Sequence, residues 1–251
     1  MKISVFFFFT AHFLLLSLNS CKENKVPEAK KKVMIDPNGQ SEFDNLVSAI
    51  DASLATDSSK SLRFENDEFT RKQLLLYRYE NISCTKWIFE EDGKNGEQKT
   101  THFYFNKGKL IHSKKITFED DLVYETKSYY NEKMQGIFSS NRTSSSFLEL
   151  DKAALKPCDF VTHNFKECLN IKDTEGLFET KFIELINFEG VDFMRVGNKE
   201  NSGYWTDIIV PEMNDSIKQL EKLKTKNKLN IVFKTKNING FDYQVLESFS
   251  Y

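Results

Sequence analysis

The chain has 251 residues, with 35 Lys and Arg against 37 Asp and Glu and a formal net charge of −2 at pH 7. This balance argues against nucleic acid as the main partner, because a nucleic-acid binder needs an excess of basic side chains. Twenty-three Phe and nine Tyr, beside only four Pro and ten Gly, indicate packed β-sheets rather than a disordered chain.

Residues 1–20 have the pattern of a secretory signal peptide. Lys2 precedes a mostly apolar run of about 16 residues that ends at Leu18, whereas a helix that spans a bilayer needs about 20. Ser20 is the small residue expected immediately before a cleavage site. We therefore expect an exported protein that begins at Cys21 after processing.

The segment Leu18-Asn19-Ser20-Cys21 resembles the lipobox of Gram-negative bacterial lipoproteins. In that family the cysteine thiol is diacylated and becomes the new N-terminus, so the resemblance implies that lipid is attached to Cys21. Two or more acyl chains hold a protein stably on a membrane. Lys22 replaces the Asp that retains enteric lipoproteins at the inner membrane, and this implies an outer-membrane location in the cell envelope.

Residues 21–40 mix charged residues with two Pro and few apolar side chains, which predicts a flexible tether. A helix is expected directly after it, with Ser41 and Asp44 as an approximate capping box. Its apolar residues recur at helical spacing and form one stripe: Phe43, Leu46, Val47, Ile50 and Leu54.

The segment from Leu74 to Asn141 divides into alternating, strand-sized pieces separated by turn sequences at 91–96, 106–108 and 119–121. Along 122–130, Leu122, Tyr124 and Tyr130 fall on one face, and the charged residues between them fall on the other. These patterns predict an antiparallel meander with one solvated face, which together with the helix forms a domain over 41–150.

Residues 175–251 show strands near 181–188, 191–196 and 205–210, then a helix, then strands near 229–236 and 241–250. This order resembles the OB-fold, a small β-barrel. The fold class expected for the whole chain is therefore α+β and mostly antiparallel β. Asn239-Gly240 predicts a type I′ turn between the last two strands. The helix is indicated by Ile217, Leu220 and Leu223, with Ser216 as its cap.

Ser216 has a second interpretation. Asp215-Ser216-Ile217 also resembles the signal at which some Gram-negative bacteria O-glycosylate exported proteins. The sequence leaves open whether Ser216 is glycosylated or only caps the helix.

Three cysteines remain besides Cys21. Cys158 and Cys168 could form a disulfide in an oxidising envelope if their Cα atoms lie within about 7 Å. Cys84 would then be a buried thiol.

The histidines His102 and His112 face each other only if the turn at 106–108 has three residues and is closed by Phe105 and Lys109. If Phe105 pairs with Leu110 instead, a one-residue slip places them on opposite faces. Two ligands would still be too few for zinc, so neither a metal nor a cofactor is expected. The carboxylates at 90–92 and 119–121 lie in predicted turns, where burial is rare.

No nucleophile elbow, metalloprotease motif or phosphate loop occurs in the sequence. The first hypothesis is therefore a membrane-anchored, non-enzymatic module that binds a protein or a saccharide. One alternative is an envelope hydrolase that uses clustered carboxylates or the pair His102 and His112. Another is an immunity-type inhibitor protein, which would present an exposed acidic or aromatic patch.

Overall fold

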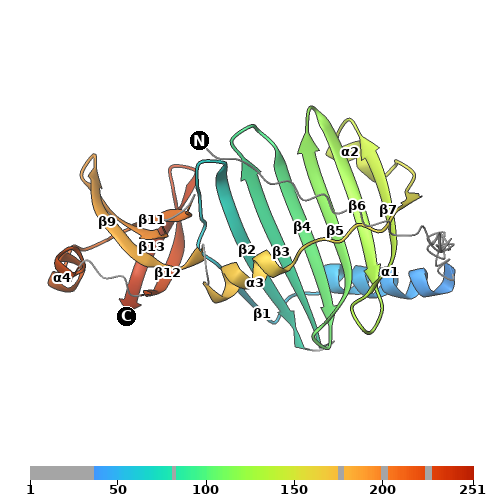
Figure 1. Ribbon diagram of the computed structural model, residues 1–251, viewed down its shortest axis with the longest axis horizontal. Coiled ribbons are helices and arrows are strands. Elements are labelled where there is room, and N and C mark those ends of the chain that lie inside the picture. The colour runs from blue at the N-terminus through green and yellow to red at the C-terminus, as the bar shows by residue number, and fades with distance from the viewer. Residues whose placement is uncertain (1–36, 81–82, 175–177, 199–202, 224–227) are drawn as a thin grey trace, which may run out of the picture. The chain divides into compact units, whose positions relative to one another are not determined.

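A computed structural model describes residues 37–80, 83–174, 178–198, 203–223 and 228–251 (Figure 1). The described residues belong to one compact unit. The predicted signal peptide, the predicted lipid attachment site Cys21 and the predicted tether as far as residue 36 lie outside the described residues.

The N-terminal helix α1 (Pro37–Ala52) begins earlier than the sequence predicts. The prediction that Ser41 caps the helix is therefore wrong, and residues 37–40 form its first turn rather than the end of a tether. Proline suits a first helical position because it has no backbone N–H to leave unpaired. Of the predicted stripe, Ile50 is fully buried, whereas Leu54 lies beyond the helix end and is 95% exposed.

The larger sheet has eight antiparallel strands in sequence order, as the predicted meander requires. The strands are β1 (Asp57–Lys60), β2 (Phe69–Tyr79), β3 (Cys84–Gly93), β4 (Gln98–Asn106), β5 (Lys109–Glu119), β6 (Leu122–Tyr130), β7 (Gly136–Ser144) and β8 (Lys156–Cys158). Two of the predicted turns are tight two-residue turns, Lys107-Gly108 and Asp120-Asp121, in which both residues have positive φ. These turns fix which residues pair across neighbouring strands.

Each face of this sheet is partly covered, so neither is the single solvated face that the sequence predicts. Helix α1 packs on one face, where Asp44 and Asp51 accept hydrogen bonds from Tyr129 and Tyr104. An extended segment, residues 159–165, crosses the other face and leads into α3 (Lys166–Asp173) (Figure 1). We call residues 159–165 the strap.

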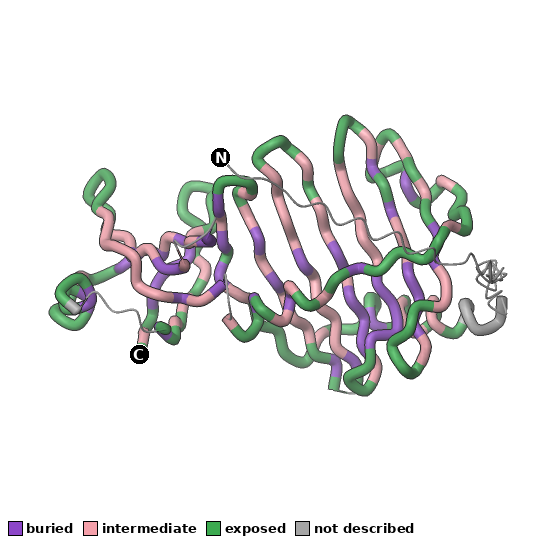
Figure 2. Tube along the Cα trace, in the orientation of Figure 1, coloured by how far each residue is buried: buried purple, intermediate pink, exposed green. Residues whose placement is uncertain are grey.

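The charged residues expected to face solvent are partly buried beneath α1. Glu125 is 3% exposed and accepts a hydrogen bond of 2.8 Å from Arg142 Nε. Arg142 also pairs with Asp151, just after the short helix α2 (Phe147–Leu150). Buried residues therefore lie on the strands between the two layers, whereas the hairpin turns are exposed (Figure 2).

The smaller sheet has five strands in the order β12-β13-β11-β10-β9. Its elements are β9 (Lys181–Phe188), β10 (Val191–Gly197), β11 (Trp205–Ile209), α4 (Asp215–Leu223), β12 (Asn230–Ile238) and β13 (Phe241–Ser250). The predicted strands and helix are all present. The predicted closed barrel is not: between the edge strands only an isolated bridge forms, Lys181 to Lys228, so the described strands form an open sheet.

In this part of the chain the sequence predicted the last turn and the apolar side of α4 correctly, but not the residue that caps α4. Asn239 and Gly240 both have positive φ, which confirms the type I′ turn. Ile217 and Leu220 are buried, as predicted. The cap of α4 is Asn214, whose Oδ1 accepts the Ile217 N–H at 3.0 Å, so the prediction that Ser216 caps the helix is wrong. Ser216 is exposed, and its glycosylation stays a prediction.

A single hydrophobic cluster draws on both sheets. Leu74 and Phe103 of the larger sheet belong to it, as do Met194 and Ile208 of the smaller one. The backbones of Glu65 and Trp205 also pair as an isolated bridge. The segments predicted as separate domains, 41–150 and 175–251, therefore share one core.

Candidate functional site

The face of the larger sheet that carries the strap is built from rows of side chains. Because residues on neighbouring strands pair directly, Thr101, Lys115 and Thr126 form one row across β4, β5 and β6. Thr117 and Tyr124 pair in the next row. Alternation along each strand places these polar side chains on the face opposite α1.

A parallel row of three serines holds the strap. Ser113, Ser128 and Ser139 pair in register across β5, β6 and β7. Ser128 Oγ donates to the Val161 carbonyl at 2.7 Å, and the Val161 N–H donates to Ser139 Oγ at 2.9 Å. Small hydroxyl side chains let the strap backbone approach the sheet and still satisfy its polar groups.

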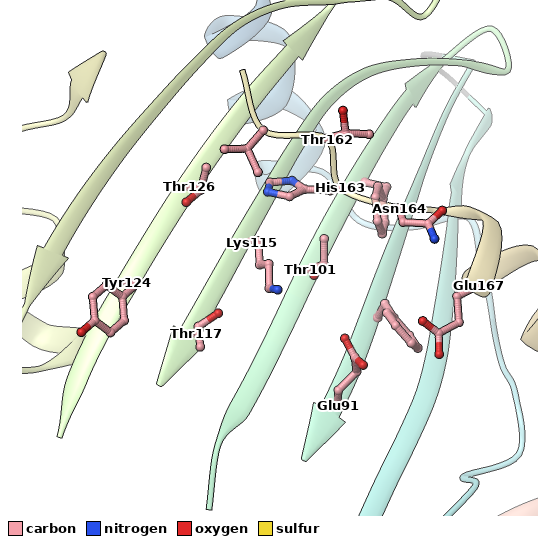
Figure 3. Close-up of a pocket in the computed structure, with 13 residues that line it drawn as sticks. Glu91, Thr101, Lys115, Thr117, Tyr124, Thr126, Thr162, His163, Asn164 and Glu167 are labelled. Carbon is pink, nitrogen blue, oxygen red and sulfur yellow. The ribbon is translucent and has the colours of Figure 1, made fainter. Parts of the chain in front are cut away.

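Between the strap and the two polar rows lies a pocket of about 460 Å³, which we call the groove. Thr162 and Asn164 of the strap line one wall. Figure 3 shows Tyr124 at one end, and Glu91 and Glu167 at the other. Polar residues therefore surround most of the space, and Phe89 and Phe103 contribute apolar surface.

The two carboxylates at the end of the groove share one buried cation. Lys72 has only 5% of its side chain exposed, and its Nζ lies 3.2 Å from Glu91 and in direct contact with Glu167. The same ammonium lies 4.1 Å from the centroid of the Phe69 ring. Because the Lys72 ammonium is buried and contacts both carboxylates, it holds Glu91 and Glu167 in place at this end of the groove.

His163 joins the strap to the sheet and borders the groove. Its Nδ1 lies 2.7 Å from Ser113 Oγ, which in turn lies 3.1 Å from the Tyr130 hydroxyl. Burial, and to a lesser degree the Lys115 ammonium, lower the pKa of His163 to about 4. His163 is therefore neutral at pH 7, and among the described residues its buried Nε2 has no hydrogen-bond partner.

The histidines singled out in the sequence lie on the other face, next to α1. Phe105 pairs with Leu110, the arrangement expected to separate them, but the register shifts by one residue after this pair. His102 and His112 consequently share a face, on either side of Tyr104 and not directly opposite each other. His112 is 1% exposed and lies beneath α1, so a substrate has no access to it.

The carboxylate clusters are not brought together. Glu90 and Asp92 form ion pairs with Arg71, while residues 119–121 are exposed in their turn. Only Glu91 of the first cluster reaches the groove.

The cysteines are not linked in the structure. Cys158 and Cys168 are both free thiols, so the disulfide that the sequence left open is not formed there. Cys168 is fully buried in α3, and burial raises the pKa of its thiol. Cys84 is buried close to α1, as expected.

Across the part of the chain that the structure describes, no three His, Cys, Asp or Glu side chains gather as a metal site. The described helices also include none with the length and apolar character needed to cross a bilayer. Comparison with protein-family models, with curated proteins and with solved structures finds no significant match to this chain.

The sequence patterns predict neither the strap nor the groove. Residues 151–173 lack a clear period, and the strap has no hydrogen-bond ladder of its own that a pattern could reveal. The available signal was the alternation along β5, β6 and β7, which places three serines on one face. Only the pairing register shows that these serines align. The fold and groove together define the class as a two-sheet, mostly antiparallel β protein in which a strap forms one wall of a groove.

Proposed function

We propose that this protein is a membrane-anchored envelope lipoprotein that binds a saccharide in the groove without transforming it. The groove carries this proposal, because hydroxyl, amide, ammonium and carboxylate groups line one open space. Sugar hydroxyls both donate and accept hydrogen bonds, so a mixed lining of this kind suits them. The apolar surface of Tyr124, which is 39% exposed, offers a contact for a sugar ring at one end.

The geometry favours binding over hydrolysis. Glu91 and Glu167 are already paired with Lys72, and a general acid needs a carboxyl that is not held by a cation. Ser113 and His163 are in contact, but Ser113 is completely buried under the strap and its hydroxyl cannot reach a ligand. These groups therefore support the strap rather than chemistry in the groove.

The proposal for the smaller sheet is that it is an open relative of the OB-fold. Counted across the sheet from the β9 edge, its strands are the first, second, third, fifth and fourth in the sequence. Helix α4 lies in the sequence between the third strand and the fourth. The isolated bridge between Lys181 and Lys228 brings its two edge strands together at one end. A partly open, five-stranded arrangement is within the range of OB-folds.

Removing hydroxyls from the groove tests saccharide binding. We expect Thr117→Val and Thr126→Val each to weaken binding by about 3- to 10-fold, because each variant removes the hydroxyl of a partly exposed groove residue and loses one hydrogen bond at nearly constant volume. Binding would be screened on an array of defined oligosaccharides and then measured by calorimetry. Thr143→Val is the matched control, since Thr143 lies on the same face of β7 but does not line the groove. Absence of any oligosaccharide binder, or equal losses in the control, would contradict the proposal.

The anchor is tested separately at Cys21. Cells given radiolabelled palmitate are expected to label the wild-type protein, and Cys21→Ala is expected to abolish the label and release the protein from the membrane fraction. The lipobox resemblance is the basis for this expectation. An unlabelled wild-type protein found in the cytosol with residues 1–20 retained would contradict it.

A further inference from the structure

We propose that the groove recognises a saccharide bearing an anionic substituent, a carboxylate or a sulfate ester, and that Lys115 binds this substituent. This inference rests on the proposed saccharide function and specifies the chemical class of the ligand. It depends on the charges around Lys115, on the hydroxyls beside it and on the position of the strap.

The first observation is that Lys115 lacks a counterion. Among the described residues, the lysines nearest to the groove are otherwise paired: Lys72 with Glu91 and Glu167, and Lys99 with Glu97. Lys115 makes neither an ion pair nor a side-chain hydrogen bond with any described residue, although it lines the pocket and is only partly exposed. The groove therefore contains one cation whose charge the described part of the protein leaves uncompensated.

The second observation is that hydroxyl groups flank this cation. Thr101 and Thr126 are its direct neighbours on β4 and β6, and Thr117 lies two residues along β5 on the same face. Thr101 is almost entirely buried, so the hydroxyls of the partly exposed Thr126 and Thr117 are the ones available to a ligand. Figure 3 shows the Lys115 ammonium between the side chains of Thr101 and Thr117. An anionic oxygen is bound best by several donors, one of them charged, and this row supplies such a set.

The third observation concerns the strap above Lys115. His163 is held through Nδ1 by Ser113 and is neutral at pH 7, so it adds no second charge to the site. Strap residues Thr162, His163 and Asn164 line the same groove as Lys115. The two acidic residues lie at one end of the groove, where Lys72 neutralises one of their two charges, whereas Lys115 lies between that end and Tyr124.

The test uses the full-length protein purified in detergent and three trisaccharide-sized probes: trigalacturonic acid, a sulfated galactose oligosaccharide and neutral galactotriose. We expect at least one anionic probe to bind about 10-fold or more tightly than galactotriose in 50 mM NaCl. This preference should shrink in 300 mM NaCl because salt screens the charge. Comparison of the carboxylated and sulfated probes distinguishes the two sources of negative charge.

Variants at Lys115 give the decisive comparison. Lys115→Gln is expected to remove the preference, so that its affinities for the anionic probe and for galactotriose agree within about 2-fold. Lys115→Arg should preserve the preference because it keeps the charge. Lys99→Gln is the matched control: it removes a lysine from the adjacent row, and the preference should persist. Thermal unfolding followed by circular dichroism confirms that each variant is folded.

The outcomes separate the two proposals. Equal affinity for all three probes, or a preference that persists in Lys115→Gln, overturns the anionic assignment and leaves saccharide binding intact. No binding of any of the three probes overturns the anionic assignment, and the oligosaccharide array then decides saccharide binding by itself. Binding of anionic probes that is equally weakened by Lys99→Gln would show attraction to general surface charge and would also overturn the role of Lys115.

Discussion

Lys72→Met is expected to lower the free energy of unfolding by about 3 kcal/mol, because it leaves Glu91 and Glu167 close together without their shared cation. The value lies at the lower end of the range for broken buried pairs, since the Glu167 side chain is 32% exposed and solvent screens it. The variant also loses the contact of the ammonium with the Phe69 ring. Urea unfolding followed by fluorescence measures the change.

Two further variants show whether charge is the cause. Arg78→Met removes a cation from an exposed pair with Asp57 and is expected to cost less than about 1 kcal/mol. Adding Glu167→Gln to Lys72→Met should recover part of the loss, because only one carboxylate then remains unpaired. A Lys72→Met protein as stable as the wild type would show that the ion cluster contributes little.

Acidification is expected to destabilise the fold through its buried histidines. The pKa of His112 is lowered to about 3 by burial first and then by Lys127, Lys114, His163 and His102. That of His163 is lowered to about 4. The unfolded chain takes up these protons near pH 6.5, whereas the folded chain does not until these lower values. The histidines therefore stabilise the fold fully above pH 6.5, and this contribution is lost as pH falls towards 4 and 3.

The expected loss for His112 and His163 is about 1.4 kcal/mol per pH unit each below pH 6.5, or about 2 to 3 kcal/mol each at pH 4.5. Urea unfolding at pH 7.5, 6.0, 5.0 and 4.5 measures it. Carboxylates add to the same trend, so His112→Phe serves as the comparison: it keeps an aromatic ring between Tyr104 and Tyr129 but removes the titrating group. Its stability should fall less steeply with acid. Parallel curves for the two proteins would contradict the role of His112.

The sequence predicted local structure well wherever a short pattern decides it. The five strands and the helix of the smaller sheet follow from alternation, from helical spacing and from the Asn239-Gly240 turn. It misplaced the cap of α4 by two residues, since Asn214 and Ser216 are both good cap residues and only the backbone shows which one precedes the helix. It also missed the first turn of α1, because residues 37–40, Pro-Asn-Gly-Gln, have no apolar side chain that could show a helical period.

Short sequence patterns could not predict the candidate site. His102 and His112 share a face only because the pairing of β4 with β5 shifts by one residue between Tyr104 and Phe105. Without that shift they would lie on opposite faces of the sheet. Glu91 was read as a solvated turn residue, yet it borders the groove because Lys72, from another strand, and Glu167, from α3, are packed beside it. Contacts between residues distant in sequence decide such positions, and a single sequence does not show them.

By itself the sequence determined that the chain is mostly antiparallel β, that apolar and polar residues alternate along its strands, and where the tight turns lie. These properties depend on side-chain size and polarity within a few residues of one another. Only the tertiary structure decided that α1 and the strap each cover part of a face of the larger sheet, that the smaller sheet stays open and that the strap forms one wall of a groove lined by Lys115. Those features arise from the register between strands and from packing across the shared core, where each contact joins distant parts of the chain.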